Sequence, residues 1–225
     1  MRVGIVIALA AEARTLAGGE GAFLGDGRYR VRVSGPGPRR AAAAAGDLLA
    51  DGCEALLSFG LAGGLAPELR AGALIVANAV HTAQHGPLAC DRTLHDALLA
   101  RLDAVGAVSA SVYGADTPII TSDDKHVLHA RLGVAAVDME SAAIARVAHD
   151  RQRPCAVLRC VVDPAGFTLP HAALAGMAED GGSRPFATAA ALLRHPLELP
   201  DLIRLALWYG GALRALRGAG ALLCG

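Results

Sequence analysis

The chain has 225 residues, of which 53% are hydrophobic, so it can form one well-buried core and is not a disordered or coiled-coil chain. Its 21 basic residues balance 21 acidic ones, and nucleic acid is therefore not an expected partner. Five cysteines without a CxxC spacing argue against disulfides or a zinc site, and no apolar run reaches the roughly 20 residues of a membrane span. We expect a cytoplasmic protein.

Short apolar runs alternate along the chain with segments rich in alanine and leucine. The runs predicted as strands cover residues 3–9, 29–34, 55–59, 74–80, 108–113, 135–138 and 155–162. The segments predicted as helices cover residues 39–49, 93–102, 122–132 and 139–150. Because the strands are apolar on both faces, helices must cover the sheet. This alternation predicts the α/β class.

The pattern changes after residue 194 to a single apolar stripe with arginines on another side. The stripe recurs every three or four residues and consists of Leu202, Leu205, Tyr209, Leu213 and Leu216. We predict an amphipathic helix over residues 200–217, within a helical extension (195–225) packed on a main domain (1–194). The alternative is that the helix meets a membrane surface, with its arginines on anionic headgroups.

Carboxylates follow three of the predicted strands. Glu12 comes after the first strand, Glu140 after the strand that ends at Asp138, and Asp163 after the strand 155–162. In α/β folds, ligands bind at the carboxyl ends of the strands, and carboxylates there can accept hydroxyl protons from a sugar. Glu12 alone also fits an ordinary helix start, and Asp138 fits a helix cap, but capping does not explain Glu140.

Small residues follow the strand 55–59. Gly60, Leu61, Ala62 and Gly63 let a ligand approach the backbone, although a tight turn is the alternative. The segment 35–40 lacks the third glycine of the dinucleotide fingerprint, which disfavours a nicotinamide-dependent dehydrogenase.

These motifs together resemble the purine nucleoside phosphorylase/uridine phosphorylase superfamily, and within it the methylthioadenosine/S-adenosylhomocysteine nucleosidases. The matching segments are Leu61-Ala62-Gly63-Gly64-Leu65-Ala66-Pro67, Asp138-Met139-Glu140-Ser141-Ala142 and Arg159 to Asp163, within a stretch that spans residues 3–163 in the right order. The resemblance implies one domain with a central mixed, largely parallel sheet flanked by helices. It also implies a homo-oligomer, a dimer, that needs no cofactor.

The resemblance also assigns roles. Glu12 would activate the attacking water, Met139 and Glu140 would bind the ribose, and Asp163 would protonate N7 of the purine. An Asp at the acid position implies adenine as the base. The residues implied for the pocket of the base or nucleophile are Gly60, Leu61, Ala62, Gly63, Val137, Asp138 and Arg159.

The sequence departs from the nucleosidases at three places. Leu61 stands where they usually have Ser, the loop 113–118 replaces their purine-binding loop, and the stretch 80–92 is shorter. The residue that stacks on the base is therefore unassigned, and a wider pocket for the 5′ group is expected. With the C-terminal helix, these departures resemble the hopanoid-associated nucleoside phosphorylases, which implies a bulky apolar 5′ group such as that of adenosylhopane.

Two alternatives to hydrolysis stay open. Phosphorolysis would use inorganic phosphate as co-substrate, but Glu12 favours water. A non-catalytic module that binds a nucleoside or lipid is disfavoured because Glu12, Glu140 and Asp163 are all present. The Arg39-Arg40 pair is read as a solvated pair and not as a phosphate site.

No metal site is expected. His81 and His85 lie four residues apart with only Asp91 near them in sequence, which does not make a convincing ligand set. The other histidines considered are read as surface or satisfied core residues: His126, His129, His149, His171 and His195.

Overall fold

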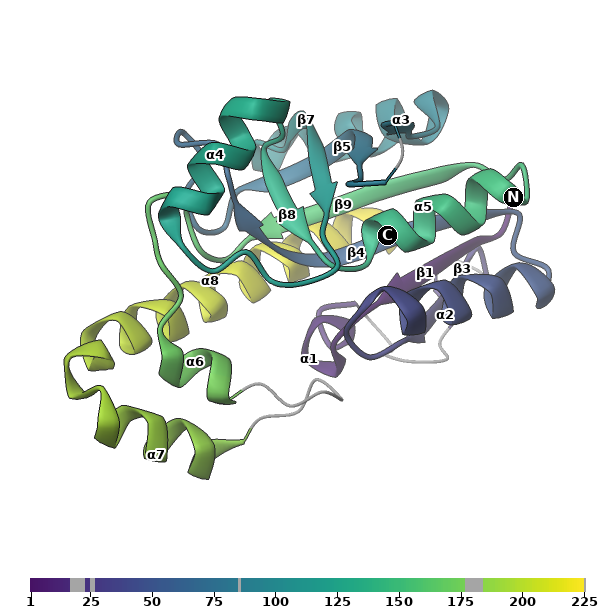
Figure 1. Cartoon of the computed structure of the whole chain (residues 1–225). Helices are drawn as coiled ribbons and strands as arrows, with labels where there is room; N and C mark the ends of the chain where they lie inside the picture. The colour runs from purple at the N-terminus through teal and green to yellow at the C-terminus, as the bar shows by residue number, and fades with distance from the viewer. Residues whose placement is uncertain (17–22, 25–26, 85, 177–183, 225) are drawn as a thin grey trace.

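The computed structural model describes residues 1–16, 23–24, 27–84, 86–176 and 184–224 (Figure 1). The strands are β1 (Val3–Ile7), β2 (Phe23–Leu24), β3 (Tyr29–Val33), β4 (Ala55–Gly64), β5 (Leu74–His81), β6 (Leu88–Ala89), β7 (Val108–Gly114), β8 (Ala136–Asp138) and β9 (Cys155–Val161). The helices are α1 (Ala10–Ala13), α2 (Pro38–Ala50), α3 (Arg92–Leu102), α4 (Ser122–Leu132), α5 (Ser141–Asp150), α6 (His171–Gly176), α7 (Pro185–Arg194) and α8 (Leu199–Cys224). Two short 3₁₀ turns are η1 (Asp103–Val105) and η2 (Pro196–Glu198).

The strands form one mixed sheet in the order β2-β3-β1-β4-β8-β7-β5-β6, and β9 pairs with both β4 and β5. Strands β4, β8, β7, β5 and β9 therefore pair in a closed ring, from which β1, β3 and β2 continue outward. The pairs β1–β3, β1–β4, β4–β9, β5–β7 and β7–β8 are parallel. The predicted α/β domain with a mixed sheet between helices is confirmed.

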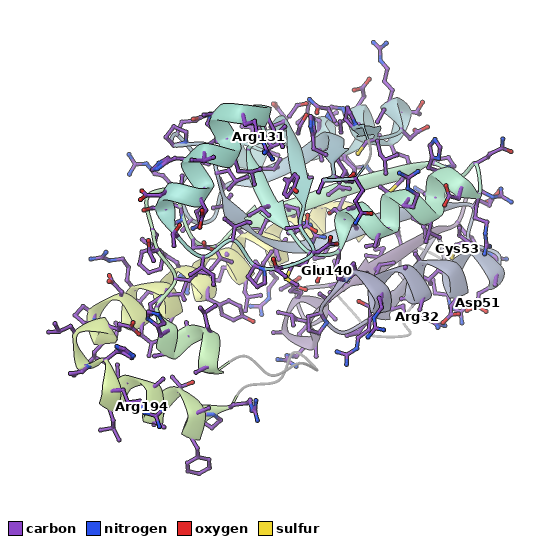
Figure 2. The ribbon with its side chains drawn as sticks, in the orientation of Figure 1. Arg32, Asp51, Cys53, Arg131, Glu140 and Arg194 are labelled. Carbon is purple, nitrogen blue, oxygen red and sulfur yellow. The ribbon has the colours of Figure 1, made fainter. Side chains whose placement is uncertain are left out.

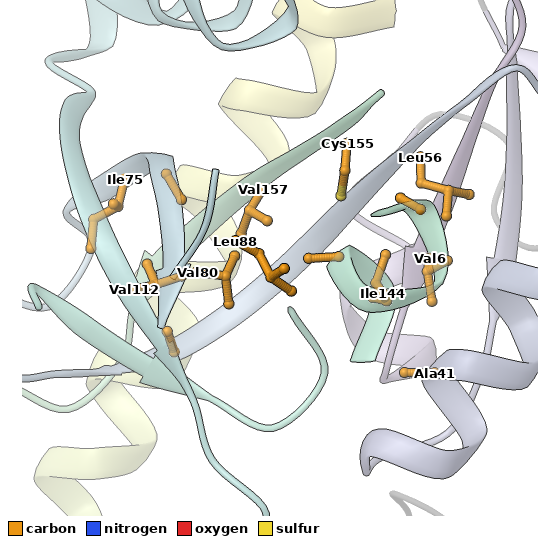
Figure 3. Packing of buried hydrophobic residues seen from close by; sticks show 14 of the residues in the cluster. Val6, Ala41, Leu56, Ile75, Val80, Leu88, Val112, Ile144, Cys155 and Val157 are labelled. Atoms are coloured by element: carbon orange, nitrogen blue, oxygen red, sulfur yellow. The ribbon is translucent and has the colours of Figure 1, made fainter. Parts of the chain in front are cut away.

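Helices cover both faces of the sheet because successive strand residues point to opposite sides (Figure 1). In β1, Val6 packs with α2 and α5 on one face, in the cluster seen in Figure 3. Its neighbours Ile5 and Ile7 pack on the other face with residues of α3 and α8. Burial on both faces explains why these strands read as continuous apolar runs in the sequence.

Several predicted elements match the structure closely, and one strand is longer than expected. Helix α4 covers the predicted residues, and the Thr121 side chain caps it by accepting from the Asp124 N–H. The predicted strand 55–59 continues to Gly64, because β9 pairs with β4 as far as Ala62 and β8 pairs with Gly63 and Gly64. The alternative of a tight turn at these glycines is wrong.

The C-terminal helix α8 runs along the sheet and is longer than the predicted span 200–217. Its buried residues belong to the same cluster as β1 and β9: Ala212, Leu216, Ala219 and Leu223. From the predicted stripe, Leu205, Tyr209 and Leu216 join this cluster, whereas Leu202 and Leu213 are half-buried and do not belong to it. Among the described helices, none is long and apolar enough to cross a membrane.

Candidate active site

The buried charges of the described chain gather along one stretch of β4. They are Glu12, Lys125, Asp138, Glu140, Arg159 and Asp163. Gly60 lies against Glu12 and Arg159, and Gly63, three residues further along β4, lies against Asp163. Burying a charge is costly unless it is paired, and such groups concentrate where a protein does chemistry. This stretch is therefore the candidate active site.

The site lies at a gap in the strand pairing of β4. On one side of β4, β1 pairs with residues 55–58 and β8 with Gly63 and Gly64, while β9 follows the other side as far as Ala62. In the interval between β1 and β8, the Leu61 N–H donates to Glu12 Oε1 at 2.8 Å. The interval is therefore an unpaired part of this edge of β4, close to the carboxyl ends of β1 and β9, where ligands bind in α/β sheets.

Glu12 reaches this interval of β4 from the short helix α1. Its Oε1 accepts from the Leu61 N–H and its Oε2 from the Leu9 N–H at 2.9 Å, so two backbone donors fix the carboxylate. Burial raises the pKa of Glu12 to about 7, although these N–H groups and the charge of Arg159 oppose the shift. A carboxylate with a pKa near neutrality is suited to general base catalysis.

Arg159 of β9 is the buried cation on this side of the site. Its Nε donates to Asp138 Oδ2 at 3.1 Å, and its Nη2 donates to Ser58 Oγ at 2.7 Å and to Ser141 Oγ at 3.0 Å. Asp138 Oδ1 also accepts from the Glu140 and Ser141 N–H groups at the start of α5. The structure therefore places Asp138 as a helix cap paired with Arg159.

Glu140 lies where the β8–α5 turn meets the loop before α2 (Figure 2). Its Oε1 accepts from the Gly37 N–H at 2.9 Å, and its Oε2 is 4.0 Å from Arg159 Nη2. Burial raises the pKa of Glu140, and the charge of Arg159 opposes the rise. Met139 beside it is half-buried. Unlike Asp138, Glu140 is not held by a helix cap, so its carboxylate can serve a ligand.

Asp163 follows β9 at the other end of the site. Its Oδ2 accepts from Lys125 Nζ of α4 at 2.5 Å, and its backbone oxygen accepts from the Gly64 N–H. Burial raises the pKa of Asp163, and Lys125 opposes the rise through its charge and its hydrogen bond. The structure thus places Glu12 and Asp163 at opposite ends of residues 60–63. Because an extended strand rises about 3.3 Å per residue, they lie roughly 10 Å apart along β4.

Sequence reasoning missed Lys125, although the sequence carries a signal. Lys125 is the only lysine of the chain, and every other basic residue is an arginine. Its position in the polar run 121–126 looks like an ordinary solvated helix face, yet its side chain is fully buried. Its partner Asp163 is 38 residues away in sequence, so no local pattern reveals the pair.

Of the two glycines in the site, Gly60 is required by what lies against it and Gly63 is not. A Cβ on Gly60 would stand 2.7 Å from Arg159 Nη1 and 2.8 Å from Glu12 Oε1. A Cβ on Gly63 would lie 3.4 Å from Asp163 Oδ2 and Val137 Cγ1, which is an ordinary van der Waals contact. The half-buried Leu61 and buried Ala62 lie between these glycines. Any larger side chain at position 60 would displace Glu12 or Arg159. The close approach of these two charged groups to β4 therefore depends on the glycine.

Two aromatic residues from outside the predicted set lie near these charges. Burial and the charge of Glu12 raise the pKa of Tyr209, which places this residue of α8 within electrostatic reach of Glu12. Phe167 follows Asp163 and packs edge to face on Trp208, also from α8, with ring centroids 5.0 Å apart. Helix α8 therefore lies near both ends of the site, with Tyr209 at the Glu12 end and Trp208 against Phe167 at the Asp163 end.

Among the described residues, a possible metal ligand set lies outside this site. His171, His195 and Glu198 bring their ligand atoms within 4.8 Å of one another. His171 Nδ1 lies 2.6 Å from Glu198 Oε1, and the two histidines are solvent-exposed, as expected from the sequence. His85 of the considered His81 pair lies outside the described residues, and Arg39 and Arg40 are exposed at the start of α2.

The family model of the phosphorylase superfamily matches residues 20–194. A methylthioadenosine/S-adenosylhomocysteine nucleosidase from Campylobacter jejuni is 17% identical, with a TM-score of 0.73 over 100% of this chain and 97% of that one. A Colwellia psychrerythraea nucleosidase of the same kind, in complex with adenine, is 23% identical, with a TM-score of 0.65 over 74% and 84%. A mutant futalosine hydrolase from Helicobacter pylori is 20% identical, with a TM-score of 0.61 over 72% and 89%. No curated protein matches the sequence.

Proposed function

Because the chain belongs to the phosphorylase superfamily, we propose that it hydrolyses the N-glycosidic bond of an adenine nucleoside. The observation that carries the proposal is the line of buried carboxylates along β4, with Glu12 and Asp163 at its ends and Glu140 beside Arg159. Gly60 and Gly63 are three residues apart on β4, so roughly 10 Å separates the two carboxylates along the strand. Glycosidic cleavage needs groups of this kind on both sides of the anomeric carbon.

In the proposed reaction, Glu12 takes a proton from water while the water oxygen attacks C1′ of the ribose. Asp163 gives a proton to N7 of the purine as the bond between C1′ and N9 breaks, so the base leaves as a neutral molecule. Glu140 binds the ribose hydroxyls with Met139 beside it. Positive charge that develops on the ribose is stabilised by the surrounding carboxylates. The products are free adenine and a 5′-substituted ribose.

The charge balance of the site supports water as the nucleophile. Four buried carboxylates, namely Glu12, Asp138, Glu140 and Asp163, face two buried cations, Arg159 and Lys125. A phosphate anion would enter a negatively charged pocket in which Arg159 is already engaged by Asp138. Phosphorolysis is the alternative. Following adenine release by chromatography with and without phosphate distinguishes the two, because strict dependence on phosphate would exclude hydrolysis.

We propose that the base is adenine and that Asp163 is the acid that faces it, because the resemblance links an Asp rather than an Asn at this position to 6-aminopurines. The adenine complex of the Colwellia psychrerythraea protein supports this assignment by fold analogy. Adenosine and inosine should be compared under the same conditions. Release of hypoxanthine at the same kcat/KM as adenine would overturn the assignment.

We propose that the 5′ substituent is bulky and apolar, as in adenosylhopane. The support is the apolar surface exposed by the elements that follow the site, where Phe186, Leu197 and Leu207 lie on α7, η2 and α8. The alternative substrates are methylthioadenosine and S-adenosylhomocysteine, after which the Campylobacter jejuni neighbour is named. A 5′-alkylated adenosine should be cleaved with a higher kcat/KM than methylthioadenosine, and the reverse order would favour the alternative.

The same exposed surface leads us to propose a peripheral membrane contact through α8, whose Arg204 is exposed near Leu207. Co-sedimentation with anionic liposomes tests it, and native protein that stays in the supernatant would overturn it. We also propose a homo-oligomer, a dimer, by analogy with the family. Light scattering of the purified protein should give twice the mass of the chain, and a monomer mass would contradict this.

A further inference from the structure

The environment of Lys125 is unusual for a lysine. Its side chain is fully buried, and Nζ donates to Asp163 Oδ2 at 2.5 Å, to the Phe167 carbonyl at 2.7 Å and to the Pro164 carbonyl at 3.3 Å. An ammonium group has three N–H donors, and here three acceptors receive them. Full pairing of this kind is what allows a charge to remain buried. The pocket is therefore built for an ammonium ion.

The choice of lysine at this position is specific. The chain uses arginine at every other basic position, so its composition favours arginine, yet position 125 is lysine. A guanidinium is planar and presents a wide fork of donors, whereas an ammonium is a compact point charge. Three acceptors that converge on one atom, among them the carbonyls of Pro164 and Phe167, fit the ammonium and not the fork.

We propose that Lys125 is a positioning residue that fixes the Asp163 carboxylate through Oδ2 and leaves its other oxygen to act on the base. This inference rests on the proposed function for the role of Asp163 as the acid. The same ammonium also holds the turn that follows Asp163, because it binds the carbonyls of Pro164 and Phe167. One side chain of α4 thereby sets both the direction of the acid and the path of the chain behind it.

Lys125 must also influence the protonation of Asp163. It is the charged group that acts on Asp163, through both its charge and its hydrogen bond. Burial raises the pKa of Asp163 and Lys125 opposes this. Removing the ammonium should therefore raise the pKa of Asp163 further. This consequence separates a positioning role from a purely structural one, because lost packing would admit water and lower the pKa of Asp163, whereas loss of the ammonium raises it.

The experiment compares native protein with K125M, K125R and the control R131M. Arg131 lies on the same helix but is exposed (Figure 2), so R131M removes a cation without touching Asp163. Asp163 is titrated by carbon NMR of labelled aspartate, with D163N identifying its signal. We expect a higher pKa of Asp163 in K125M, and unchanged values in R131M. K125R keeps the positive charge, so the pKa of Asp163 in K125R should be closer to the native value than it is in K125M.

Activity provides the second measurement. K125M should lose at least about 10-fold in kcat/KM for an adenine nucleoside, because a misdirected acid is costly, and the pH limb that depends on Asp163 should move to higher pH. K125R should not recover the full rate. An unchanged pKa of Asp163 in K125M would overturn the inference, whether or not the native protein releases adenine. A native protein that releases no adenine would count against the proposed function alone. Native rate and pH profile in folded K125M would also overturn the inference.

A further measurement does not depend on the folding of K125M. Because Lys125 is the only lysine, lysine labelled with ¹⁵N at Nζ gives a single side-chain signal in native protein. We expect the ammonium protons to be protected from exchange with water, and the signal to move in D163N. Rapid exchange in native protein, or an unmoved signal in D163N, would show that the pair does not form and would overturn the inference.

Discussion

The two ends of the site hold buried carboxylates in different ways. Glu12 is fixed by the N–H groups of Leu9 and Leu61, and its nearest cation, Arg159, is engaged by Asp138. Asp163 is fixed by direct contact with the ammonium of Lys125. Burial raises the pKa of both groups, but it is opposed mainly by backbone dipoles at the first and by a full charge at the second.

The difference shows how one fold can separate a base from an acid. Backbone N–H groups orient Glu12 and still leave its pKa near neutrality, so it can take a proton from water and release it again. The ammonium holds Asp163 in one direction and limits the effect of burial on its pKa. Pairs of titratable groups in contrasting environments are the usual way in which enzymes divide acid and base roles.

Removing the carboxylate of Glu12 should give the largest effect. We expect E12Q to lower hydrolysis of an adenine nucleoside by at least about 1,000-fold, because the combined losses of a general base and of an oriented water exceed either alone. Binding of the nucleoside, measured by calorimetry, should remain, since the partner of Glu12 is water and not the purine. Normal turnover in E12Q would contradict the role of Glu12.

The E12Q variant also tests the environment of Glu12 through stability, in a measurement that does not require enzyme activity. The pKa of Glu12 is about 7 in the folded protein and 4.5 in the unfolded chain, so the folded state binds the proton more tightly. The free energy of unfolding of native protein should therefore fall, relative to E12Q, as pH rises from about 4.5 through 7. The change should approach about 3 kcal/mol. Urea unfolding at several pH values measures it, and a constant difference would show that Glu12 is not desolvated.

Asp163 should show a smaller kinetic effect. We expect D163N to lower kcat/KM for adenine nucleosides by at least about 100-fold, because general acids typically contribute that much. Asn can still accept a hydrogen bond from Lys125, so the fold should survive, which thermal melting can verify. A substrate with an activated leaving group, which needs no protonation, should lose less. Unchanged turnover in folded D163N would remove Asp163 from the acid role.

The sequence predicts the framework of the molecule better than it predicts the details of the site. Helix α4 could be placed because a Ser-Asp-Asp start and the glycine after Leu132 mark its ends. The extension of β4 through Gly60–Gly64 could not, because pairing with β9 and β8 overrides the turn preference of glycine. The sequence did not predict α6 and α7, each of which buries a single residue, Ala172 and Ala191, so tertiary packing marks them only weakly.

The site, like the fold, has residues that the sequence predicts and residues that only tertiary packing brings together. Carboxylates at strand ends can be read from the sequence because parallel strands end at one edge, which brings Glu12 and Asp163 to the same edge of the sheet. Strand β8 is the exception, since it runs antiparallel to β4 and brings Glu140 in from the other direction. The pairing of Lys125 with Asp163 depends on the packing of α4 across the sheet, which no local pattern encodes.

Glu140 combines the environments of Glu12 and Asp163, because it has one backbone N–H donor and one nearby cation. Its replacement should have the smallest effect on activity. Glu140 accepts from one backbone N–H, that of Gly37, and Arg159 stands 4.0 Å away, so one of its oxygens remains available for ribose hydroxyls. We expect E140A to lower kcat/KM for adenosine about 10-fold more than for 2′-deoxyadenosine, because only the ribonucleoside loses a hydroxyl bonded to the carboxylate. The exposed Glu68 provides the control, since E68A removes a carboxylate outside the site and should change neither substrate. Arg159 keeps its contacts with Asp138 and Ser58 in E140A, so the fold should be retained. Equal losses on both nucleosides would mean that Glu140 acts on the structure of the β8–α5 turn and does not bind the ribose.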